Sequence, residues 1–327
     1  MKQFKAMVVK EKDDSIVHGV ENISLDDLHV GNVVVQVAYS SINYKDMLAV
    51  QPKGGVVRSY PMIPGIDLSG TVHSSDDERF SPGQEVLITG YDLGVSHTGG
   101  FSEYARVNAD WLVPLPDGLS LKEVMIFGTA GFTAAQSVSA LEQHGMNPAD
   151  NPAILVTGST GGVGSIALQI LTKLGYQNIT ALVRKDYQVD VAKELGAAHV
   201  VFPDDLGEKR LLSRQNYHYV LDTVGGDVAA TLIPQLHENG SITMCGNAAG
   251  VKLETNVLPF ILRGINVLGI NSVTVPMTER QALWDRMAHE WNITGTTLTK
   301  EVSLEEAVDT LNDIKNGQHL GRTIIKL

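Results

Sequence analysis

Short apolar runs separated by turn residues fill the first 120 residues. The runs at 4–9, 32–38 and 85–89 have the length and β-branched content of strands. Glycine and proline fall densely between them, for example at 52–55 and 61–65. Because these residues interrupt regular structure, an irregular, barrel-like β domain is predicted here.

From residue 121 the pattern changes to helical spacing, which predicts a long helix over 121–143. After a polar connector, short apolar runs alternate with amphipathic segments. The expected strands are 154–157, 179–183, 199–202, 219–222, 241–245 and 265–270, with helices at 163–174 and 188–195. Strands that alternate with helices predict a parallel, doubly wound α/β sheet.

The C-terminal segment returns to a mixed pattern. Ser303 is followed three residues later by Glu306, which is a capping-box pattern at the start of a helix. A helix over 304–316 and a closing strand over 323–326 are therefore expected.

Four glycines lie in residues 157–164, between a predicted strand and a predicted helix. Glycines let the backbone approach a pyrophosphate, and the helix N-terminus supplies N–H donors. Ser159 stands where the dinucleotide pattern has its first glycine. A plain strand–helix turn is the alternative, but it does not need four glycines in seven residues. The expected cofactor contacts are Thr160, Gly161, Gly162, Val163 and Gly164.

The second strand of this domain ends in Arg184-Lys185, where an NAD site usually carries a carboxylate. Cations pair with phosphate, so this ending favours the 2′-phosphate of NADPH. A solvated pair of loop cations is the alternative. Later strand ends should also face the cofactor, since doubly wound sheets bind ligands at their carboxyl ends. These residues are Asp222, Thr223, Gly246, Asn271 and Ser272.

A short-chain dehydrogenase is the other class with a comparable glycine pattern. Its glycine motif should begin near the N-terminus, whereas this one begins after about 155 residues. Its catalytic Tyr-x-x-x-Lys is also missing, because none of the nine tyrosines has a lysine four residues later. This alternative is rejected.

Charge and cysteine content narrow the remaining classes. The formal net charge is −12, from 25 Lys+Arg and 37 Asp+Glu, which disfavours nucleic acids and anionic membranes as partners. The sequence has no run of about 18 consecutive apolar residues, so no membrane-spanning helix is predicted. The single cysteine, Cys245, excludes an intramolecular disulfide and a Cys-based structural zinc site. A cytoplasmic protein is expected.

Several motifs together resemble the medium-chain dehydrogenase/reductase superfamily. Within it the chain is similar to the zinc-free quinone oxidoreductase-like branch, which includes NADPH-dependent acrylyl-CoA reductases. The motifs are SSINYKD at 40–46, PMIPGID at 61–67, FGTAGFTA at 127–134, the glycine loop, PFILR at 259–263 and GRT at 321–323. They extend over nearly the whole chain.

The resemblance implies a GroES-like β-rich catalytic domain over 1–122, completed by about 297–327, and a Rossmann NADPH-binding domain over 123–296. It also implies a homodimer, a cofactor cleft between the domains and hydride transfer without metal. Without a Lewis acid, an activated C=C bond is the easier acceptor, because the adjacent carbonyl delocalises charge. The expected reaction is reduction of a 2-enoyl thioester, acryloyl-CoA above all.

Hydride addition to such a thioester leaves an enolate that needs a hydrogen-bond donor. Tyr44, which the family places beside the nicotinamide, is the first candidate, although a packing role is the alternative. Lys45 and Asp67 are further catalytic candidates. The alternative for Lys45 is an ordinary exposed lysine, and the alternative for Asp67 is a carboxylate that holds the loops by hydrogen bonds. Histidine as a residue type exchanges protons near neutral pH, so His97 is a candidate proton relay, unless it is a plain surface histidine.

Substrate recognition is expected on the first domain. Lys53 and Arg58 lie on a glycine-containing loop and would attract the phosphates of coenzyme A, unless they are only solvated. Asn43 is expected to orient the loop at the substrate. Arg322 is expected to complete the cofactor site, with a structural ion pair as the alternative.

Two other functions stay open at this point. One is an NADPH:quinone or general enone reductase without preference for coenzyme A. The other is an NADPH-binding sensor or structural protein that turns over no substrate.

Overall fold

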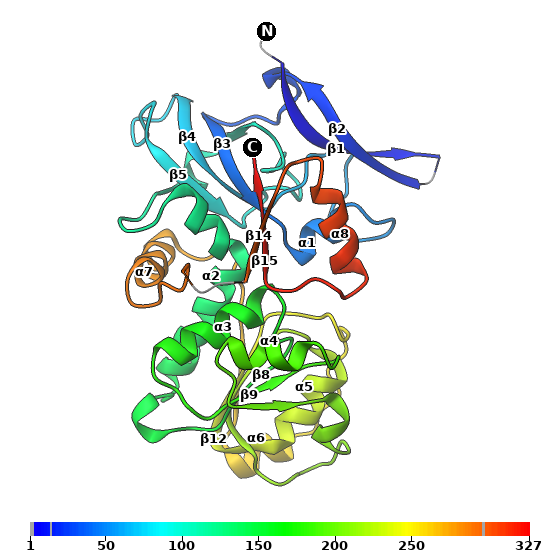
Figure 1. Ribbon diagram of the computed structural model, residues 1–327, viewed down its shortest axis with the longest axis vertical. Coiled ribbons are helices and arrows are strands. Elements are labelled where there is room, and N and C mark those ends of the chain that lie inside the picture. The colour runs from blue at the N-terminus through cyan, green and yellow to red at the C-terminus, as the bar shows by residue number, and fades with distance from the viewer. Residues whose placement is uncertain (1–2, 14, 296–297) are drawn as a thin grey trace. The chain divides into compact units, whose positions relative to one another are not determined.

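The computed structural model describes residues 3–13, 15–295 and 298–327 and divides the chain into two compact units. The first unit comprises Met1–Thr129, Val273–His289 and Leu298–Leu327, and the second comprises Ala130–Ser272 and Glu290–Thr297. Each unit contains a sheet of its own (Figure 1).

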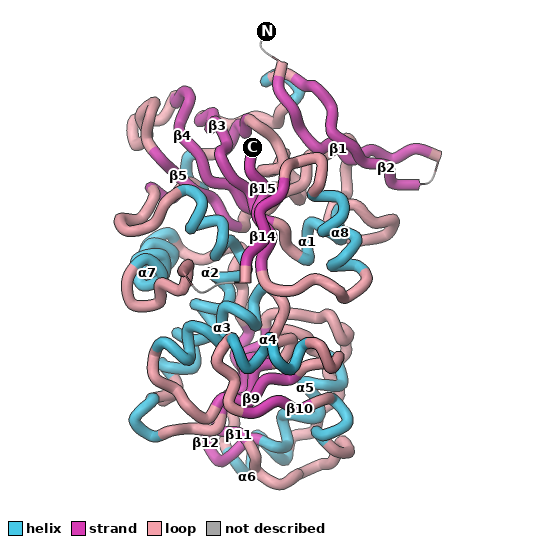
Figure 2. The backbone as a smooth tube through the Cα atoms, in the orientation of Figure 1, coloured by secondary structure: helices cyan, strands magenta, loops and turns pink. Residues whose placement is uncertain are grey.

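The first unit is built on a seven-stranded sheet with the order β14-β15-β3-β4-β5-β7, in which β6 also pairs with β3. A separate two-stranded sheet, β1-β2, accompanies it (Figure 2). The strands are β1 (Phe4–Lys12), β2 (Ser15–Ile23), β3 (Val33–Ser41), β4 (Asp67–Ser75), β5 (Glu85–Thr89), β6 (Tyr104–Val107), β7 (Val113–Pro114), β14 (Thr299–Val302) and β15 (Arg322–Lys326). The strands expected at 4–9, 32–38, 85–89 and 323–326 are confirmed.

The C-terminal strand closes this unit. β15 runs antiparallel to β3, with Ile324 opposite Ser41, and Ile42 N–H donates to the carbonyl of Thr323. This pairing places the start of β15 beside the end of β3, although about 280 residues separate them in sequence. The chain end is therefore part of the region that follows β3.

The helices of the first unit are α1 (Tyr44–Ala49), α7 (Met277–Ala288) and α8 (Ala307–Lys315), with short 3-10 turns at η1 (Leu25–Asp27) and η2 (Ala109–Trp111). The predicted capping box precedes α8. Ser303 N–H and Oγ both donate to Glu306 Oε2 at 2.8 Å, and Glu306 N–H donates back to Ser303 Oγ. The helix expected over 304–316 is thus confirmed, with a later start.

The unit boundaries differ from the expected domain boundaries around α7. The sequence places 273–289 in the Rossmann domain, whereas the structure places this segment in the first unit. Arg280 of α7 is fully buried and donates to the carbonyl and hydroxyl oxygens of Thr89 at 2.8 and 2.9 Å. Its guanidinium also lies 4.6 Å from the centre of the Tyr91 ring. These contacts anchor α7 to the end of β5. The boundary expected between 296 and 297 lies outside the described residues.

The long helix α2 (Leu121–Gln143) has the predicted bounds, but it is kinked. Gly128 has φ 53° and ψ −159°, which interrupts the helix just before the unit boundary at 129–130. By length and composition α2 could cross a membrane. However, 78% of its apolar window is buried inside the protein, as in a core helix.

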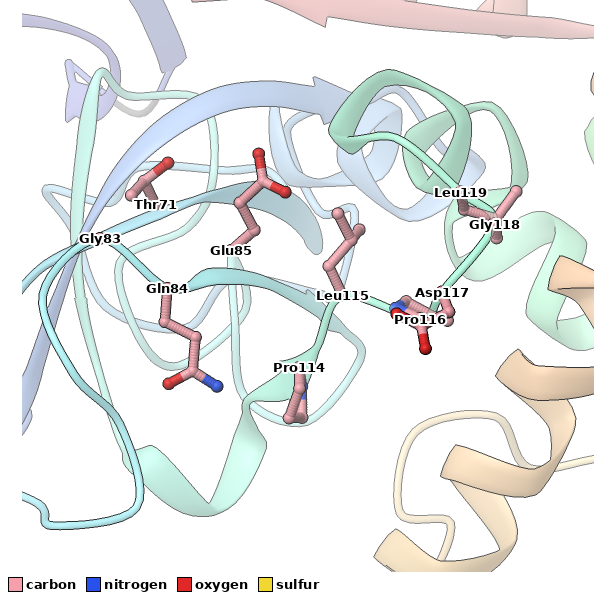
Figure 3. A pocket seen from close by; sticks show the side chains of 10 residues that line it. All are labelled: Thr71, Gly83, Gln84, Glu85, Pro114, Leu115, Pro116, Asp117, Gly118 and Leu119. Atoms are coloured by element: carbon pink, nitrogen blue, oxygen red, sulfur yellow. The ribbon is translucent and has the colours of Figure 1, made fainter.

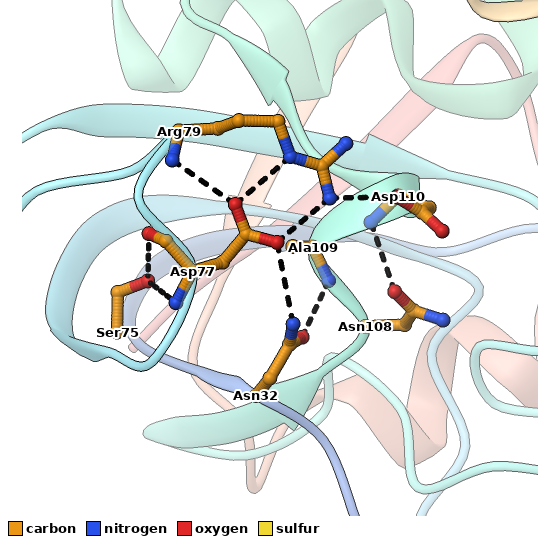
Figure 4. A network of polar contacts seen from close by, with 7 residues as sticks. All are labelled: Asn32, Ser75, Asp77, Arg79, Asn108, Ala109 and Asp110. Carbon is orange, nitrogen blue, oxygen red and sulfur yellow. Dashed lines mark hydrogen bonds and ion pairs between the residues drawn. The ribbon is translucent and has the colours of Figure 1, made fainter.

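A polar network holds the turn after β4 against η2 (Figure 4). Arg79 Nε and Nη2 each donate to Asp77 at 2.8 Å, and Nη2 also donates to Asp110 at 2.6 Å. These hydrogen bonds lower the pKa of Asp77 to about 2. Since Arg79 and Asp110 are exposed, the network fixes a surface turn and contributes little to stability.

The second unit is a six-stranded parallel sheet with the order β10-β9-β8-β11-β12-β13. Its elements are β8 (Ile154–Val156), α3 (Gly162–Lys173), β9 (Ile179–Leu182), α4 (Gln188–Glu194), β10 (His199–Val201), β11 (Tyr217–Asp222), α5 (Gly226–Leu232), β12 (Leu236–Met244), α6 (Leu258–Arg263) and β13 (Asn266–Gly269). Along the chain, β9 and β10 are added successively on one side of β8, and β11, β12 and β13 are added successively on its other side. This is the predicted doubly wound order, and it brings all the carboxyl ends of the strands to one edge.

Candidate active-site and cofactor-binding residues

The glycine loop of the second unit leaves no room for side chains at two positions. Gly158 has φ +56°, and a Cβ there would lie 2.4 Å from Thr223 Oγ1. A Cβ on Gly164 would lie 2.3 Å from the carbonyl oxygen of Gly158. Gly161 is the N-cap of α3, whose first N–H groups have no acceptor within the helix. The loop thus forms a backbone cradle at a helix N-terminus, which fits a pyrophosphate.

The neighbouring strand ends are tied together by side chains. Thr157 Oγ1 donates to Asp222 Oδ1 at 2.8 Å and accepts from Thr223 N–H at 2.8 Å. Asp222 is fully buried, burial raises its pKa, and it also accepts from Gly225 N–H. The expected direct cofactor contact of Asp222 is therefore corrected, because its carboxylate is occupied by the ends of β8 and β11. A Cβ on Gly246 would lie 1.8 Å from the carbonyl oxygen of Thr223, so this glycine serves close packing.

The basic pair follows β9 as predicted. Arg184 is exposed and Lys185 is half-buried, with its Nζ 5.7 Å from the centre of the Tyr187 ring. The backbone N–H groups of both cations donate to Gln188 Oε1, at 2.9 and 3.1 Å. The sequence did not predict a role for Gln188, because nothing in its position marks it as more than the first residue of a helix. At the far edge of the sheet, Asn271 and Ser272 follow β13, and the Asn271 carbonyl accepts from Gln136 Nε2.

In the first unit, Tyr44 is the first residue of α1 and 46% of its surface is exposed. Asn43, the N-cap of this helix, is buried and donates through its backbone N–H to Asp46 Oδ2 at 2.8 Å. Lys45 is half-buried at the next position. The cap fixes the helix start, so Tyr44 projects from a rigid backbone.

Two carboxylates lie buried beneath this helix start. Asp46 accepts three backbone N–H bonds, from Asn43, Gly65 and Ile66. Burial, reinforced by the charge of Asp67, raises the pKa of Asp46 to about 7, against the effect of these bonds. Asp46 therefore connects the start of α1 to the loop before β4.

Asp67 is the centre of the buried network. It accepts from Ser41 Oγ, from Asn43 Nδ2 at 2.7 Å, from Thr129 N–H at 2.9 Å and from Thr129 Oγ1. No part of Asp67 is exposed. The expected catalytic role is corrected to a positioning role, since both carboxylate oxygens are occupied by the protein. Asn43, likewise, orients the loop and is too buried to be a substrate-binding surface.

Arg322 completes the network from β15. Its guanidinium donates to Ser41 Oγ at 2.8 Å and to the carbonyl oxygens of Ile42 and Ile126 at 3.1 and 3.0 Å. Only 1% of this residue is exposed, so the expected cofactor contact is corrected to a structural role. A Cβ on Gly128 would lie within 2.7 Å of Ser41 Oγ, Asp67 Oδ2 and Arg322 Nη2, which explains the kink in α2 at this glycine.

His97, the proposed proton relay, has a backbone carbonyl within hydrogen-bond distance of each ring nitrogen. His97 Nδ1 lies 3.0 Å from the carbonyl oxygen of Thr98, and Nε2 lies 3.0 Å from that of Val30. Its ring packs edge-on against His29 and Trp111. A neutral ring can donate to only one of these two carbonyls at a time, so the relay role of His97 stays a prediction.

The expected substrate cations lie on the loop after α1. Lys53 and Arg58 are both exposed, and Lys53 has φ +59°. The loop is anchored by apolar residues that pack together, among them Val57 and Met62. The two cations are therefore accessible to an anionic ligand.

A cavity of about 580 Å³ lies elsewhere on the first unit (Figure 3). It is lined by Thr71, Gly83, Gln84, Glu85 and residues 114–119. None of the predicted site residues belongs to this lining, and its carboxylates would repel an anionic substrate. It is not part of the candidate site.

The donor set does not fit a zinc ion. Among residues 3–13, 15–295 and 298–327, no group of three or more His, Cys, Asp or Glu side chains is placed to hold a metal. Burial, together with Asp222, raises the pKa of the Cys245 thiol to about 12, and this thiol donates to the carbonyl oxygen of Asp222.

Comparison with known proteins matches both units. Residues 29–117 match the family described as alcohol dehydrogenase GroES-like domain, and residues 162–289 match that described as zinc-binding dehydrogenase. The acrylyl-CoA reductase AcuI of Ruegeria pomeroyi is 42% identical over 98% of both chains. YhfP of Bacillus subtilis, named as a quinone oxidoreductase, is 46% identical over 99% of both.

The chain belongs to the medium-chain dehydrogenase/reductase superfamily, in its acrylyl-CoA reductase-like branch. Solved structures of this superfamily agree with the assignment. YhdH of Escherichia coli, solved with NADPH, is 42% identical with a TM-score of 0.95 over 98% of this chain and 99% of that one. YhfP, solved with NAD, is 45% identical with a TM-score of 0.96 over all of both chains.

Proposed function

We propose that this protein is a zinc-independent, NADPH-dependent reductase of the activated C=C bond of 2-enoyl thioesters, with acryloyl-CoA reduced to propionyl-CoA. The observation that carries the proposal is Tyr44, an exposed phenol on a helix start that is fixed by buried carboxylates. The proposal is also supported by a relative named as an acrylyl-CoA reductase, which is 42% identical over almost the full chain.

The second unit is the proposed cofactor-binding part. The glycine cradle at the start of α3 fits a pyrophosphate, and the exposed Arg184 with its neighbour Lys185 fits a 2′-phosphate. The relatives include one solved with NADPH and one solved with NAD. We infer NADPH for this chain because, after β9 and Val183, the two cations Arg184 and Lys185 come before the first carboxylate, Asp186.

When bound, NADPH supplies a hydride for the β-carbon of the thioester. The Tyr44 hydroxyl would donate to the thioester carbonyl oxygen as negative charge develops there. Lys45, at the next position, would add a positive potential. Because both ring nitrogens of His97 face backbone carbonyls, water is the proposed source of the proton for the α-carbon.

Lys53 and Arg58 are the proposed contacts for the phosphates of coenzyme A. Both are exposed on one loop of a protein that is otherwise strongly acidic. Arg58→Ala is expected to raise the KM for acryloyl-CoA severalfold and to leave the KM for a quinone unchanged. The relative named as a quinone oxidoreductase favours the alternative, a quinone or general enone reductase, for which Arg58→Ala would alter neither KM.

Replacement of Tyr44 tests the proposed chemistry. Tyr44→Phe should lower kcat by about 10²-fold, because it removes one donor to a developing oxyanion, and should leave the Kd for NADPH unchanged. Tyr219→Phe is the matched control, since that hydroxyl makes only a 3.4 Å contact with the carbonyl oxygen of His144. An unchanged kcat in Tyr44→Phe would exclude the proposed role.

We also propose that the protein is a cytoplasmic homodimer joined at the second unit. β13 is the last strand of the parallel sheet, and α6 and the residue before it expose Val257, Ile261 and Leu262 by 60–69%. An apolar surface beside a sheet edge suits a second copy of the same edge. Ile261→Glu should produce monomers in sedimentation experiments, whereas Val30→Glu, at an exposed valine of the first unit, should not.

A further inference from the structure

A buried amide connects the two parts of the proposed cofactor site. Gln188 begins α4, and only 7% of its surface is exposed. Its Oε1 accepts the backbone N–H groups of Arg184 and Lys185 at 2.9 and 3.1 Å. Its Nε2 donates to Thr160 Oγ1 of the glycine loop at 3.0 Å.

A primary amide meets all three contacts without carrying a charge. Two donors converge on its oxygen, and its nitrogen donates to the Thr160 hydroxyl. A carboxylate at this position would accept from the Thr160 hydroxyl instead, but it would place a negative charge close to both proposed phosphate sites. An apolar side chain would leave two buried or half-buried backbone donors without their acceptor, which costs about as much as the bonds are worth.

The bonds determine where the two cations begin. Gln188 Oε1 accepts both of these N–H groups, so Gln188 fixes the backbone from which Arg184 and Lys185 extend. Through Thr160, the same amide fixes the distance from this turn to the cradle for the pyrophosphate. In NADPH the pyrophosphate and the 2′-phosphate are a fixed number of bonds apart. The distance between the basic turn and the glycine loop therefore decides whether the protein can bind both groups at once.

We propose that Gln188 is a positioning residue that sets the preference for NADPH over NADH by holding the Arg184–Lys185 turn against the glycine loop. The proposal rests on the NADPH binding proposed above. Gln188 is too buried to contact the 2′-phosphate, so its effect passes through the two cations.

A residue that merely supported the fold would behave differently. Its loss would weaken NADPH and NADH to the same extent, because both share the pyrophosphate and the nicotinamide. A residue that positions the cations affects only the ligand with a 2′-phosphate. The ratio of the two dissociation constants therefore separates the two roles.

The test is a titration of the full chain with NADPH and with NADH, followed by cofactor fluorescence. In Gln188→Met, which keeps the side-chain volume, the ratio Kd(NADH)/Kd(NADPH) should fall about tenfold, the equivalent of one to two hydrogen bonds. The pair Arg184→Ala/Lys185→Ala should abolish the preference. Adding Gln188→Met to that pair should change the ratio no further, because the groups that it positions are gone.

Gln235→Met is the matched control. Gln235 is also a buried bridging amide of the second unit, with Nε2 bonded to the carbonyl of Leu206 and Oε1 bonded to Asn216. It lies at the amino end of β12, whereas Arg184 and Lys185 follow the carboxyl end of β9. Its replacement should leave the ratio unchanged. Should Gln188→Met fail to fold, Thr160→Val removes the acceptor of its Nε2 and should lower the ratio in the same direction.

The outcomes distinguish this inference from the proposed function. If Gln188→Met weakens NADPH and NADH equally, while the Arg184/Lys185 pair still controls the preference, the inference is overturned and the NADPH site stands. If the unaltered protein binds NADH as tightly as NADPH, the NADPH assignment is wrong, and the inference about Gln188 is wrong as well. A selective fall in the ratio supports both.

Discussion

The buried network beneath Tyr44 and the basic turn after β9 place their charged groups in opposite ways. In the first, Asp46, Asp67 and Arg322 lie buried beneath an exposed tyrosine, and their contacts are with the protein. In the second, Arg184 is exposed beyond a loop built from glycine backbone. The first arrangement uses charge to hold a backbone, and the second keeps charge available to a ligand.

This difference has an energetic consequence. A buried charge that loses its partner remains without solvent, so substitutions in the buried network should lower stability strongly. An exposed cation returns to water at little cost, so substitutions in the basic turn should change affinity and leave stability nearly unaltered. We therefore expect stability to respond to the first kind of substitution and cofactor affinity to the second.

The largest effect is expected for Asp67→Ala. Four hydrogen-bond donors from Ser41, Asn43 and Thr129 lose their acceptor, and the nearby Arg322 charge loses its compensation. The free energy of unfolding should fall by about 3 to 5 kcal/mol, as measured by urea denaturation. Asp110→Ala, in the exposed network of Figure 4, should leave the unfolding midpoint nearly unchanged. Equal effects of the two would contradict the distinction between buried and exposed charge.

The next effect is expected in the glycine loop. Gly164→Ala brings a Cβ to 2.3 Å from the Gly158 carbonyl oxygen, so the cradle must shift. Overpacking of this kind costs about 1 to 3 kcal/mol, and the Kd for NADPH should rise about tenfold or more by titration. Gly19→Ala has open space around its Cβ and should bind NADPH normally. Unaltered NADPH binding in Gly164→Ala would remove the cradle from the proposed site.

The smallest effect concerns pH and the surroundings of Arg322. Burial, assisted by Arg322, lowers the pKa of His319 to about 4 from its ordinary 6.5. Between these values the unfolded chain takes up a proton that the folded protein refuses, so stability is present above pH 6.5 and falls as the pH drops toward 4. From pH 7 to pH 5 the wild type should lose about 1 to 2 kcal/mol more than His319→Gln in urea unfolding. Parallel losses would show that His319 titrates normally.

Much of the fold follows from local sequence patterns. The strand at 154–157, the glycine loop and the helix at 163–174 are confirmed as β8 and α3, because alternation and glycine punctuation act over short distances. Gly175, with φ +88°, ends α3 as a left-handed residue. The sequence did not predict the helix α7 and the strand β4, because their patterns of apolar and polar residues are weak. Tertiary contacts such as that of Arg280 with Thr89 stabilise them instead.

The candidate site was only partly predictable. The glycine loop and the basic pair lie within 30 residues of one another, and their chemistry is visible in the sequence. The network of Asp67 joins residues 41, 43, 67, 129 and 322, which only the pairing of β15 with β3 brings together. Sequence reasoning identified Asp67 and Arg322 as polar site residues, but it could not show that both are buried.

The proposed function is tested most directly by oxidation of NADPH by the purified protein with acryloyl-CoA as the acceptor, compared with NADH as donor and with a simple quinone as acceptor. We expect turnover with the thioester and NADPH, and little turnover when either is exchanged. Quinone reduction without turnover of the thioester would contradict it. So would bound NADPH with no acceptor reduced, which would identify a binding protein.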